Sequence, residues 1–292
     1  MKNNLPSSIQ TLKGKWISPH IYNLQINRPE KLNSMNFQFF DELPQAVKFL
    51  NEQNELRVVI LTGNGKHFSV GLDLTESMLS HIDEKNDHAR QSIMIYSLIK
   101  KWQNSISSLS NCRVPVIVGI HNACIGGAID LISACDIRYC TKDTKFCIKE
   151  VDIGICADLG TVQVIFYLFL IIFLYKKRIP LLTGNDSIFR ELNYTGRTFD
   201  FQEAQQLGLI SKSVENKDEM MKDLLKLAED ISSKSPVAVW TIKQSLNHDL
   251  NQIVEKNLDY IARINAAMLN TTDVQECVNA FFQKRKPIFP KL

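Results

Sequence analysis

The sequence lacks the patterns by which metal and nucleotide sites are usually recognised. Its seven cysteines form no C-x-x-C pair, and its six histidines show no ligand spacing around them, so no metal site is expected. It also has neither a P-loop nor the three-glycine fingerprint of dinucleotide-binding folds. Most of the cysteines fall in apolar segments, which predicts buried free thiols in a reducing compartment.

An excess of one charge sign is also missing. The 34 Lys and Arg residues nearly balance the 31 Asp and Glu residues, and the formal net charge is +3. This balance indicates no basic surface, so nucleic acid is not expected as a partner. The apolar run at 164–175 has twelve residues. A membrane-spanning helix needs about 20 residues, so no stable membrane span is expected.

What the sequence does contain is a repeated alternation of strand and helix patterns. Alternating or continuous apolar runs predict strands, and helical spacing of apolar residues predicts helices. Segment 68–92 is polar and predicts a surface loop that leads to a helix. Together the patterns indicate an α/β architecture with stacked sheets. The expected strands are 20–27, 57–62, 114–120, 136–140 and 145–149, and the first expected helix is 36–52.

The C-terminal part of the chain is predicted to be mostly helical. We therefore expect a core at 1–215 and a helical region at 216–292 that serves oligomerisation. Phe281 and Phe282 on one helix face would cover the core or a neighbouring subunit. The expected helices are 217–232, 236–248, 250–269 and 272–284.

Two glycine-containing turns, 68–74 and 124–130, each follow a buried strand. Glycine allows the backbone to approach a ligand closely, and a helix that begins at the second turn offers unpaired N–H groups. Two N–H groups aimed at one point would form an oxyanion hole. The alternative interpretation is two ordinary tight turns.

Three carboxylates lie in apolar surroundings downstream of the first strands. Asp130 is expected in the first turn of an apolar helix, Glu150 at the end of a strand, and Asp158 in an apolar stretch. Burial would raise their pKa values, which suits proton transfer near neutral pH. The alternatives are helix capping or compensation of the helix dipole by Asp130, and a surface ion pair of Glu150 with Lys149 or a nearby Arg.

Four motifs together resemble the enoyl-CoA hydratase/isomerase (crotonase) family. They are the run at 113–161, R-P-E-K-L-N-S-M-N at 28–36, H-F-S-V-G-L-D-L at 67–74 and S-S-K-S-P-V-A-V at 232–239. The resemblance extends from about residue 15 to residue 292. It implies a spiral of repeated ββα units, and an oxyanion hole that binds the carbonyl of a coenzyme A thioester through the N–H groups of Leu72 and Gly127.

Within that family, the carboxylates resemble those of the Δ3,5-Δ2,4-dienoyl-CoA isomerases. Hydratases carry glutamates at the positions of Asp130 and Glu150, whereas this chain has the further Asp158. The resemblance implies isomerisation of a 3,5-dienoyl-CoA to a 2,4-dienoyl-CoA in the β-oxidation of unsaturated fatty acids. Asp158 is assigned as the base at C2 and Glu150 as the acid at C6, while Asp130 is a buried neighbour that orients them.

The resemblance also implies how coenzyme A is held. Lys31 resembles a basic residue near the nucleotide phosphates, and Gly71 and Gly126 belong to the turns that receive the thioester. Lys286 and Phe289 are expected to add contacts, either in this chain or in a neighbouring subunit. Members of the family are usually trimers or dimers of trimers. Proton transfer beside a thioester requires no metal or redox cofactor, so none is expected.

Two other functions stay open at the level of sequence. One is an enoyl-CoA hydratase, against which Asp158 argues because a hydratase needs no carboxylate there. The other is a catalytically silent binding protein of the crotonase fold. Retention of all three carboxylates and both glycine turns argues against this second alternative.

Residues 164–177 depart from the family pattern. That pattern would run from Gln163 directly to Arg178-Ile179-Pro180, but fourteen residues intervene. Our hypothesis is that they are translated intron. Fourteen codons preserve the reading frame, a valine codon begins with GT, and a lysine codon can end in AG, as splice junctions do. A cDNA that retains all fourteen codons would contradict this hypothesis.

The two ends of the sequence bear on location. The first sixteen residues lack the apolar core of a secretory signal and the Arg-rich pattern of a mitochondrial presequence. The last three are Pro-Lys-Leu, which matches a peroxisomal S-K-L address at two positions. We therefore expect a peroxisomal protein, with the mitochondrion as the alternative.

Overall fold

The computed structural model describes residues 4–76, 87–161, 186–269 and 271–290. Within these residues the larger sheet has six strands, of which β1 and β2 are antiparallel and all later neighbours are parallel. Its strands, in spatial order, are β1 (Leu12–Ser18), β2 (Ile21–Ile26), β3 (Val58–Gly63), β4 (Val116–Ile120), β6 (Ile137–Thr141) and β9 (Lys212–Val214).

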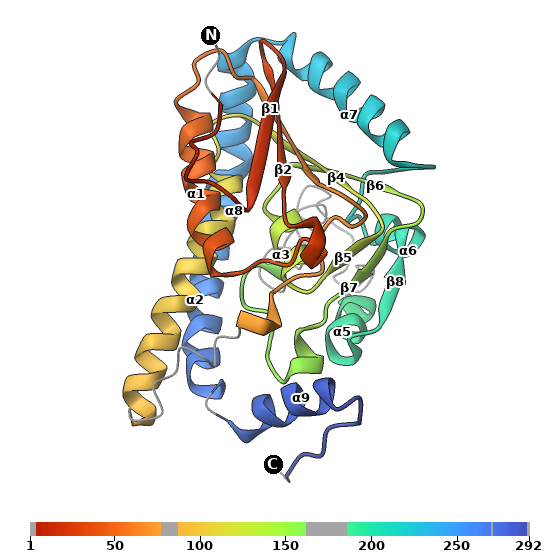
Figure 1. The fold of residues 1–292 in the computed structure, drawn as a ribbon. Coiled ribbons are helices and arrows are strands. Elements are labelled where there is room, and N and C mark those ends of the chain that lie inside the picture. Colours follow the sequence, from red (N-terminus) through yellow and green to blue (C-terminus); the bar gives the residue numbers. More distant parts are fainter. Residues whose placement is uncertain (1–3, 77–86, 162–185, 270, 291–292) are drawn as a thin grey trace, which may run out of the picture.

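Alternate side chains of the central strands point to opposite faces of the sheet and pack in two separate hydrophobic clusters. Every residue of β3 and β4 is buried, as expected for parallel strands covered on both faces. Val58 and Ile60 pack in a smaller cluster with helix α7 (Lys217–Ser232), whereas Val59 and Leu61 face the main core. The sheet therefore lies between α7 and the rest of the molecule (Figure 1).

The second sheet includes the strand that leads into the glycine turn at 124–130. In the described part of the chain it comprises β5 (Ala123–Ile125), β7 (Lys145–Cys147) and β8 (Thr198–Asp200). Strands β5 and β7 are parallel, and β7 and β8 are antiparallel. Helix α3 (Gly127–Ser133) begins two residues after β5, and all seven of its residues are buried. This arrangement places a short buried helix directly after β5 and in contact with it.

Three long helices lie together beside the sheets, at the left in Figure 1. Helix α1 (Phe37–Asn51) begins at Asn36, whose side chain accepts a hydrogen bond from the Phe39 N–H. Helix α2 (His88–Ser110) packs against α1 and against α8 (Pro236–Met268). The remaining helices are α5 (Asp186–Thr195), α6 (Phe201–Gln206) and α9 (Thr272–Phe282).

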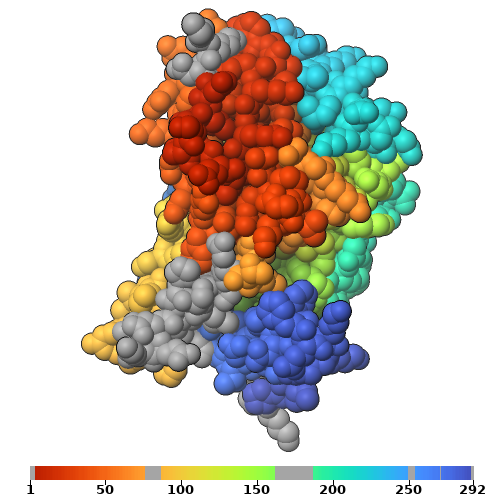
Figure 2. Space-filling model, viewed as in Figure 1, coloured from red at the N-terminus to blue at the C-terminus, as the bar shows by residue number. Residues whose placement is uncertain are grey.

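The C-terminal helix α9 and the residues after it form one end of the molecule, coloured blue in Figure 2. Helix α9 packs against η4, a short 3-10 helix at Glu150–Ile153. No helix in the described segments is long and apolar enough to cross a membrane.

The predicted α/β architecture is confirmed, and three local predictions are wrong. The expected helices 236–248 and 250–269 are one helix, α8, because no glycine or proline interrupts the chain between them. Glu150 begins η4 instead of ending a strand. Cys156 is exposed, whereas the other six cysteines are buried, and all seven are free. Residues 164–177, the hypothetical intron, lie outside the described residues.

Candidate active site

The two glycine turns predicted from the sequence are in direct contact. The backbone of Ser69 donates to the Ala123 carbonyl at 3.1 Å and accepts from the Ile125 N–H at 3.2 Å. A Cβ atom on Gly71 would lie 2.5 Å from the Ile125 carbonyl oxygen and 3.2 Å from the Gly127 nitrogen. Gly71 also has a φ of +85°, which side chains rarely allow, so glycine is required here.

Both proposed oxyanion donors are backbone N–H groups of these turns. Gly127 is the first residue of α3, so its N–H has no partner within the helix. The neighbours of Leu72 are fixed instead: the Met35 N–H donates to the Gly71 carbonyl at 2.7 Å, and the Asp73 N–H donates to the Met35 carbonyl at 2.9 Å. Within the described residues, the N–H groups of Leu72 and Gly127 form no hydrogen bond.

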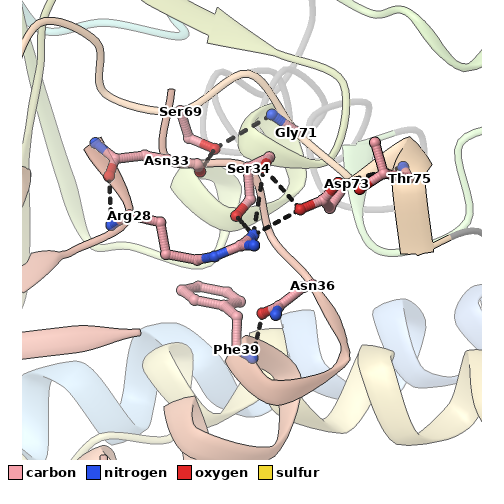
Figure 3. A network of polar contacts seen from close by, with 9 residues as sticks. All are labelled: Arg28, Asn33, Ser34, Asn36, Phe39, Ser69, Gly71, Asp73 and Thr75. Atoms are coloured by element: carbon pink, nitrogen blue, oxygen red, sulfur yellow. Dashed lines mark hydrogen bonds and ion pairs between the residues drawn. The ribbon is translucent and has the colours of Figure 1, made fainter. Parts of the chain in front are cut away.

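A buried polar network fixes the turn that carries Leu72 (Figure 3). The Arg28 guanidinium lies 2.9 Å from an Asp73 carboxylate oxygen and donates to the Ser34 carbonyl at 2.6 Å. The Ser34 hydroxyl donates to the same carboxylate oxygen at 3.2 Å. Burial raises the pKa of Asp73, but hydrogen bonds from Thr75 and Arg28 outweigh burial and hold this pKa below its usual value. Asp73 is therefore held in its charged form.

Asp130 lies in the first turn of α3, as predicted, and is 1% exposed. Its Oδ1 accepts a hydrogen bond from the Thr161 N–H. Burial raises the pKa of Asp130 to about 6, and the hydrogen bonds from Thr161 oppose this rise. The residue is thus a buried acid and not only a partner of the helix dipole.

Glu150 is buried against the second glycine turn. Its Oε1 lies 3.4 Å from the position that a Cβ atom on Gly126 would occupy. Its Oε2 is buried and has no hydrogen-bond partner among the described residues. Burial, and then the charges of Asp130 and Asp158, raise the pKa of Glu150 well above its usual value. The expected alternative, an ion pair with Lys149, is absent: Lys149 pairs with Asp152 instead.

Asp158 is 5% exposed and is held from two helices. Its Oδ2 accepts a hydrogen bond of 2.8 Å from Asn265 Nδ2 on α8, and its carbonyl accepts one of 2.7 Å from Gln103 Nε2 on α2. Burial raises the pKa of Asp158 to about 7, the hydrogen bond from Asn265 lowers this pKa, and the charge of Asp130 raises it. The three predicted carboxylates therefore influence one another and share one buried region.

A cavity of about 790 Å³ extends from Glu150 toward the C-terminal helices. Cys156 and Ala157 line this cavity, and Asp158 is the next residue in the chain. Neither Asp158 nor Asp130 is itself a lining residue. The lining is mainly apolar, with polar groups from α5 and α8. The described lining residues are Ile148, Glu150, Val151, Gly154, Ile155, Cys156, Ala157, Phe189, Arg190, Asn193, Tyr194, Asn257, Tyr260, Ile261, Asp273 and Phe289.

The residues expected to contact coenzyme A are more dispersed. Lys31 ends the 3-10 helix Pro29–Lys31, next to the network around Arg28, and its side chain is exposed. Phe289 lines the cavity, so it contributes to the site within one chain. Lys286 is exposed beyond the end of α9.

Sequence reasoning missed the residues that hold the site in place. Arg28 and Ser34 lie within a quoted motif, but their contact with Asp73 spans 45 and 39 residues of chain. Gln103 and Asn265 lie in long helices without any motif. One signal was available for Asn265: it interrupts the apolar positions 258, 261, 262 and 266 of α8, all of which are buried. A polar residue on such a stripe predicts a buried hydrogen bond.

The sequence of this chain is similar to those of known proteins. The sequence profile of the enoyl-CoA hydratase/isomerase family matches residues 17–291. The peroxisomal Delta(3,5)-Delta(2,4)-dienoyl-CoA isomerase of Arabidopsis thaliana is 43% identical over 93% of each chain. The mitochondrial Delta(3,5)-Delta(2,4)-dienoyl-CoA isomerase of Mus musculus is 41% identical over 91% of this chain and 77% of its own.

Solved structures show the same fold. A crystal structure of an enoyl-CoA hydratase/isomerase from Pseudoalteromonas atlantica matches with a TM-score of 0.78 at 24% identity, over 96% of this chain and 100% of its own. An enoyl-CoA hydratase from Bacillus halodurans matches with a TM-score of 0.78 at 19% identity, over 93% and 100% of the two chains. The predicted crotonase-type fold is therefore confirmed.

Proposed function

Because this chain belongs to the enoyl-CoA hydratase/isomerase family, we propose that it isomerises 3,5-dienoyl-CoA to 2,4-dienoyl-CoA in the β-oxidation of unsaturated fatty acids. The observation that carries the proposal is the group of three buried carboxylates, Asp130, Glu150 and Asp158, beside two unpaired backbone N–H groups. The dienoyl-CoA isomerases among the relatives support the same reaction.

In this proposal the reaction is a proton transfer in two steps. Asp158 takes a proton from C2, and the electron pair of the C–H bond passes into the thioester carbonyl to form an extended dienolate. The N–H groups of Leu72 and Gly127 stabilise the oxygen of that dienolate. One such donor is worth about 3–4 kcal/mol of barrier. Glu150 then gives a proton to C6, and the double bonds come to rest between C2 and C3 and between C4 and C5.

The electrostatics support this division of roles. A base must be ionised and an acid protonated before the reaction, so their pKa values must differ. The pKa of Asp158 is about 7, and that of Glu150 is raised well above its usual value. Asp158 accepts a hydrogen bond from Asn265 that favours its charged form, which suits a base, whereas burial and the charges of both neighbours favour the protonated form of Glu150, which suits an acid. Asp130 acts as their buried neighbour, and its charge raises the pKa of both.

The substrate is proposed to lie across the two turns. Gly71 and Gly126 allow the thioester to approach the backbone, and the cavity beside Glu150 receives the acyl chain. Lys31, exposed near the first turn, would bind the phosphates of coenzyme A. The electron sink is the thioester itself, so the proposed reaction needs no cofactor beyond the coenzyme A that the substrate carries.

At the level of the whole chain, we propose a core at 1–215 and a C-terminal helical region at 216–292 that forms a homotrimer or homohexamer. Exposed apolar side chains in that region support this division, among them Phe281 and Phe282. A peroxisomal location is proposed, with the mitochondrion as alternative, because isomerases of both organelles are among the relatives. Imaging of a fluorescent fusion beside markers of both organelles tests the location.

Turnover of 3,5-octadienoyl-CoA, followed by the absorbance of the 2,4-dienoyl product, tests the function. The wild-type protein should form product, and Asp158→Asn should lower kcat by about 10²–10⁴-fold, because a general base contributes that much. Hydration of crotonyl-CoA without isomerisation would replace the proposal with an enoyl-CoA hydratase. Binding of coenzyme A esters with neither reaction would indicate a silent binding protein.

A further inference from the structure

We propose that Asn265 is a positioning residue, which orients Asp158 and favours the ionised form of that carboxylate. The inference rests on the proposed function, in which Asp158 is the base at C2. Asn265 does not reach the reacting atoms. It acts through Asp158, from a helix 107 residues away in the chain.

The contacts of Asn265 define the direction of its side chain. Its Nδ2 donates to Asp158 Oδ2 at 2.8 Å and to the Cys156 carbonyl at 2.8 Å. An amide nitrogen carries two hydrogens, so both are used by the segment that holds the base. Asn265 is 2% exposed and Asp158 is 5% exposed, so water does not compete with this hydrogen bond. The carboxylate is therefore fixed from the side of α8.

No cation faces Asp158 in the described part of the structure. The titratable groups around it are Asp130 from α3, Glu150 from η4 and Cys156 from its own segment. Burial disfavours a negative charge on Asp158, and the charge of Asp130 does so as well. The Asn265 amide is the side-chain group that lowers the pKa of Asp158. Loss of Asn265 removes the larger of the two hydrogen-bond contributions that lower this pKa, and only a backbone hydrogen bond at Asp158 itself still opposes burial.

Gln103 provides a matched control. Like Asn265 it is a buried amide on a long helix, and its Nε2 donates to the Asp158 carbonyl at 2.7 Å and to the Leu258 carbonyl at 2.9 Å. It therefore holds the backbone at residue 158 but does not contact the carboxylate. Loss of Gln103 should change the activity only through the position of the backbone at residue 158. Loss of Asn265 should change both that position and the charge state of the carboxylate.

The first experiment compares pH profiles of kcat/KM for wild type, Asn265→Leu and Gln103→Leu. A hydrogen bond to a charged group shifts a pKa by about one unit, so the acidic limb of Asn265→Leu should move up by about one pH unit. At a pH on the acidic side of the limb, kcat/KM of this variant should then be about tenfold lower than that of wild type. On the alkaline side of the limb, kcat/KM should return to the wild-type value. Gln103→Leu should lower the activity at all pH values without moving the limb. A limb that stays in place in Asn265→Leu, or moves equally in both variants, overturns the proposal.

The second experiment does not depend on turnover. The titration of the Asp158 carboxyl carbon is followed by NMR in protein labelled with ¹³C-aspartate, and Asp158→Asn identifies the signal. Asn265→Leu should raise the titration midpoint by about one unit, and an unchanged midpoint would refute the role of Asn265. Asn265→Ser removes the amide with a smaller side chain and replaces the leucine variant if that fails to fold. If wild type lacks isomerase activity, the proposed function fails, while this titration still decides the role of Asn265.

Discussion

Glu150 and Asp158 differ in the contacts of their carboxylates, and this difference separates their proposed roles. Asp158 accepts a hydrogen bond from Asn265, which favours its charged form, whereas Glu150 Oε2 has no partner among the described residues. A buried carboxyl without a donor keeps its proton to a higher pH. The acid and the base are thus distinguished by their surroundings, since both are carboxyl groups.

Glu150→Gln tests that assignment. Glutamine fills the same space but cannot protonate C6, so kcat should fall by about 10²–10⁴-fold. Exchange of the C2 proton with D₂O should continue, because Asp158 still forms the dienolate. NMR of the substrate in D₂O measures this exchange, with Asp158→Asn as the control that should abolish it. Exchange that persists in Asp158→Asn and stops in Glu150→Gln would reverse the two roles.

At the scale of elements, the turn that carries Leu72 depends on a contact between two loops. Arg28 and Ser34 belong to the loop before α1, and Asp73 belongs to the turn after β3. The side chains of Arg28 and Asp73 are 13% and 5% exposed, so their ion pair is largely desolvated. Removal of Arg28 leaves the buried Asp73 charge with only its hydrogen bonds from Thr75 and Ser34, which is more costly than losing the attraction alone.

Arg28→Ala should therefore lower the free energy of unfolding by about 2–3 kcal/mol. It should also lower kcat, because release of Asp73 frees the Leu72 N–H from its fixed direction. Urea denaturation and steady-state kinetics measure the two effects. Arg90→Ala is the control, since Arg90 forms an exposed ion pair with Asp87, and it should change neither quantity measurably. Equal effects of the two variants would show that the Arg28 network does not support the site.

The bounds of the helices and strands show which of them can be predicted from the local sequence pattern. The strand at 20–27, the helix at 36–52 and the helix at 217–232 were predicted within one residue at each end, because each has a clear apolar period or cap. Strand β1 was not predicted. It is an edge strand with alternating burial, stabilised by pairing with β2, and this pairing is invisible in its own sequence.

At the scale of the whole molecule, the C-terminal end exposes several apolar side chains. Phe281 and Phe282 are 58% and 59% exposed, and their rings contact each other edge to face. The prediction that they cover the core of their own chain is therefore wrong, and the alternative, contact with a neighbouring subunit, stays a prediction. Exposed aromatic residues side by side are typical of interaction surfaces.

A variant with Phe281→Asp and Phe282→Asp tests this surface. Wild type should have about three or six times the chain mass of 33.4 kDa in light scattering coupled to gel filtration. The variant should give a smaller species, because two buried charges would oppose association. Ile93→Asp is the control, since Ile93 is 67% exposed on α2, outside the region 216–292. An unchanged assembly in the double variant would exclude these residues from the interface.

The sequence by itself determined the parts of the site that are encoded locally. Gly71, Gly127, Asp130 and Glu150 lie in short motifs, and a turn or a helix start depends on a few neighbouring residues. The family resemblance of those motifs identified the fold and indicated the reaction. Proton-transfer chemistry could therefore be predicted before any distance was known.

Only the tertiary structure decided how those groups are held and how they differ electrostatically. Asn265 meets Asp158 across 107 residues, Gln103 meets it across 55, and Arg28 meets Asp73 across 45. Such contacts depend on how helices pack on the sheets, and no local period records them. The pKa of a carboxylate depends on its burial and on the charges near it, both of which are properties of the folded chain.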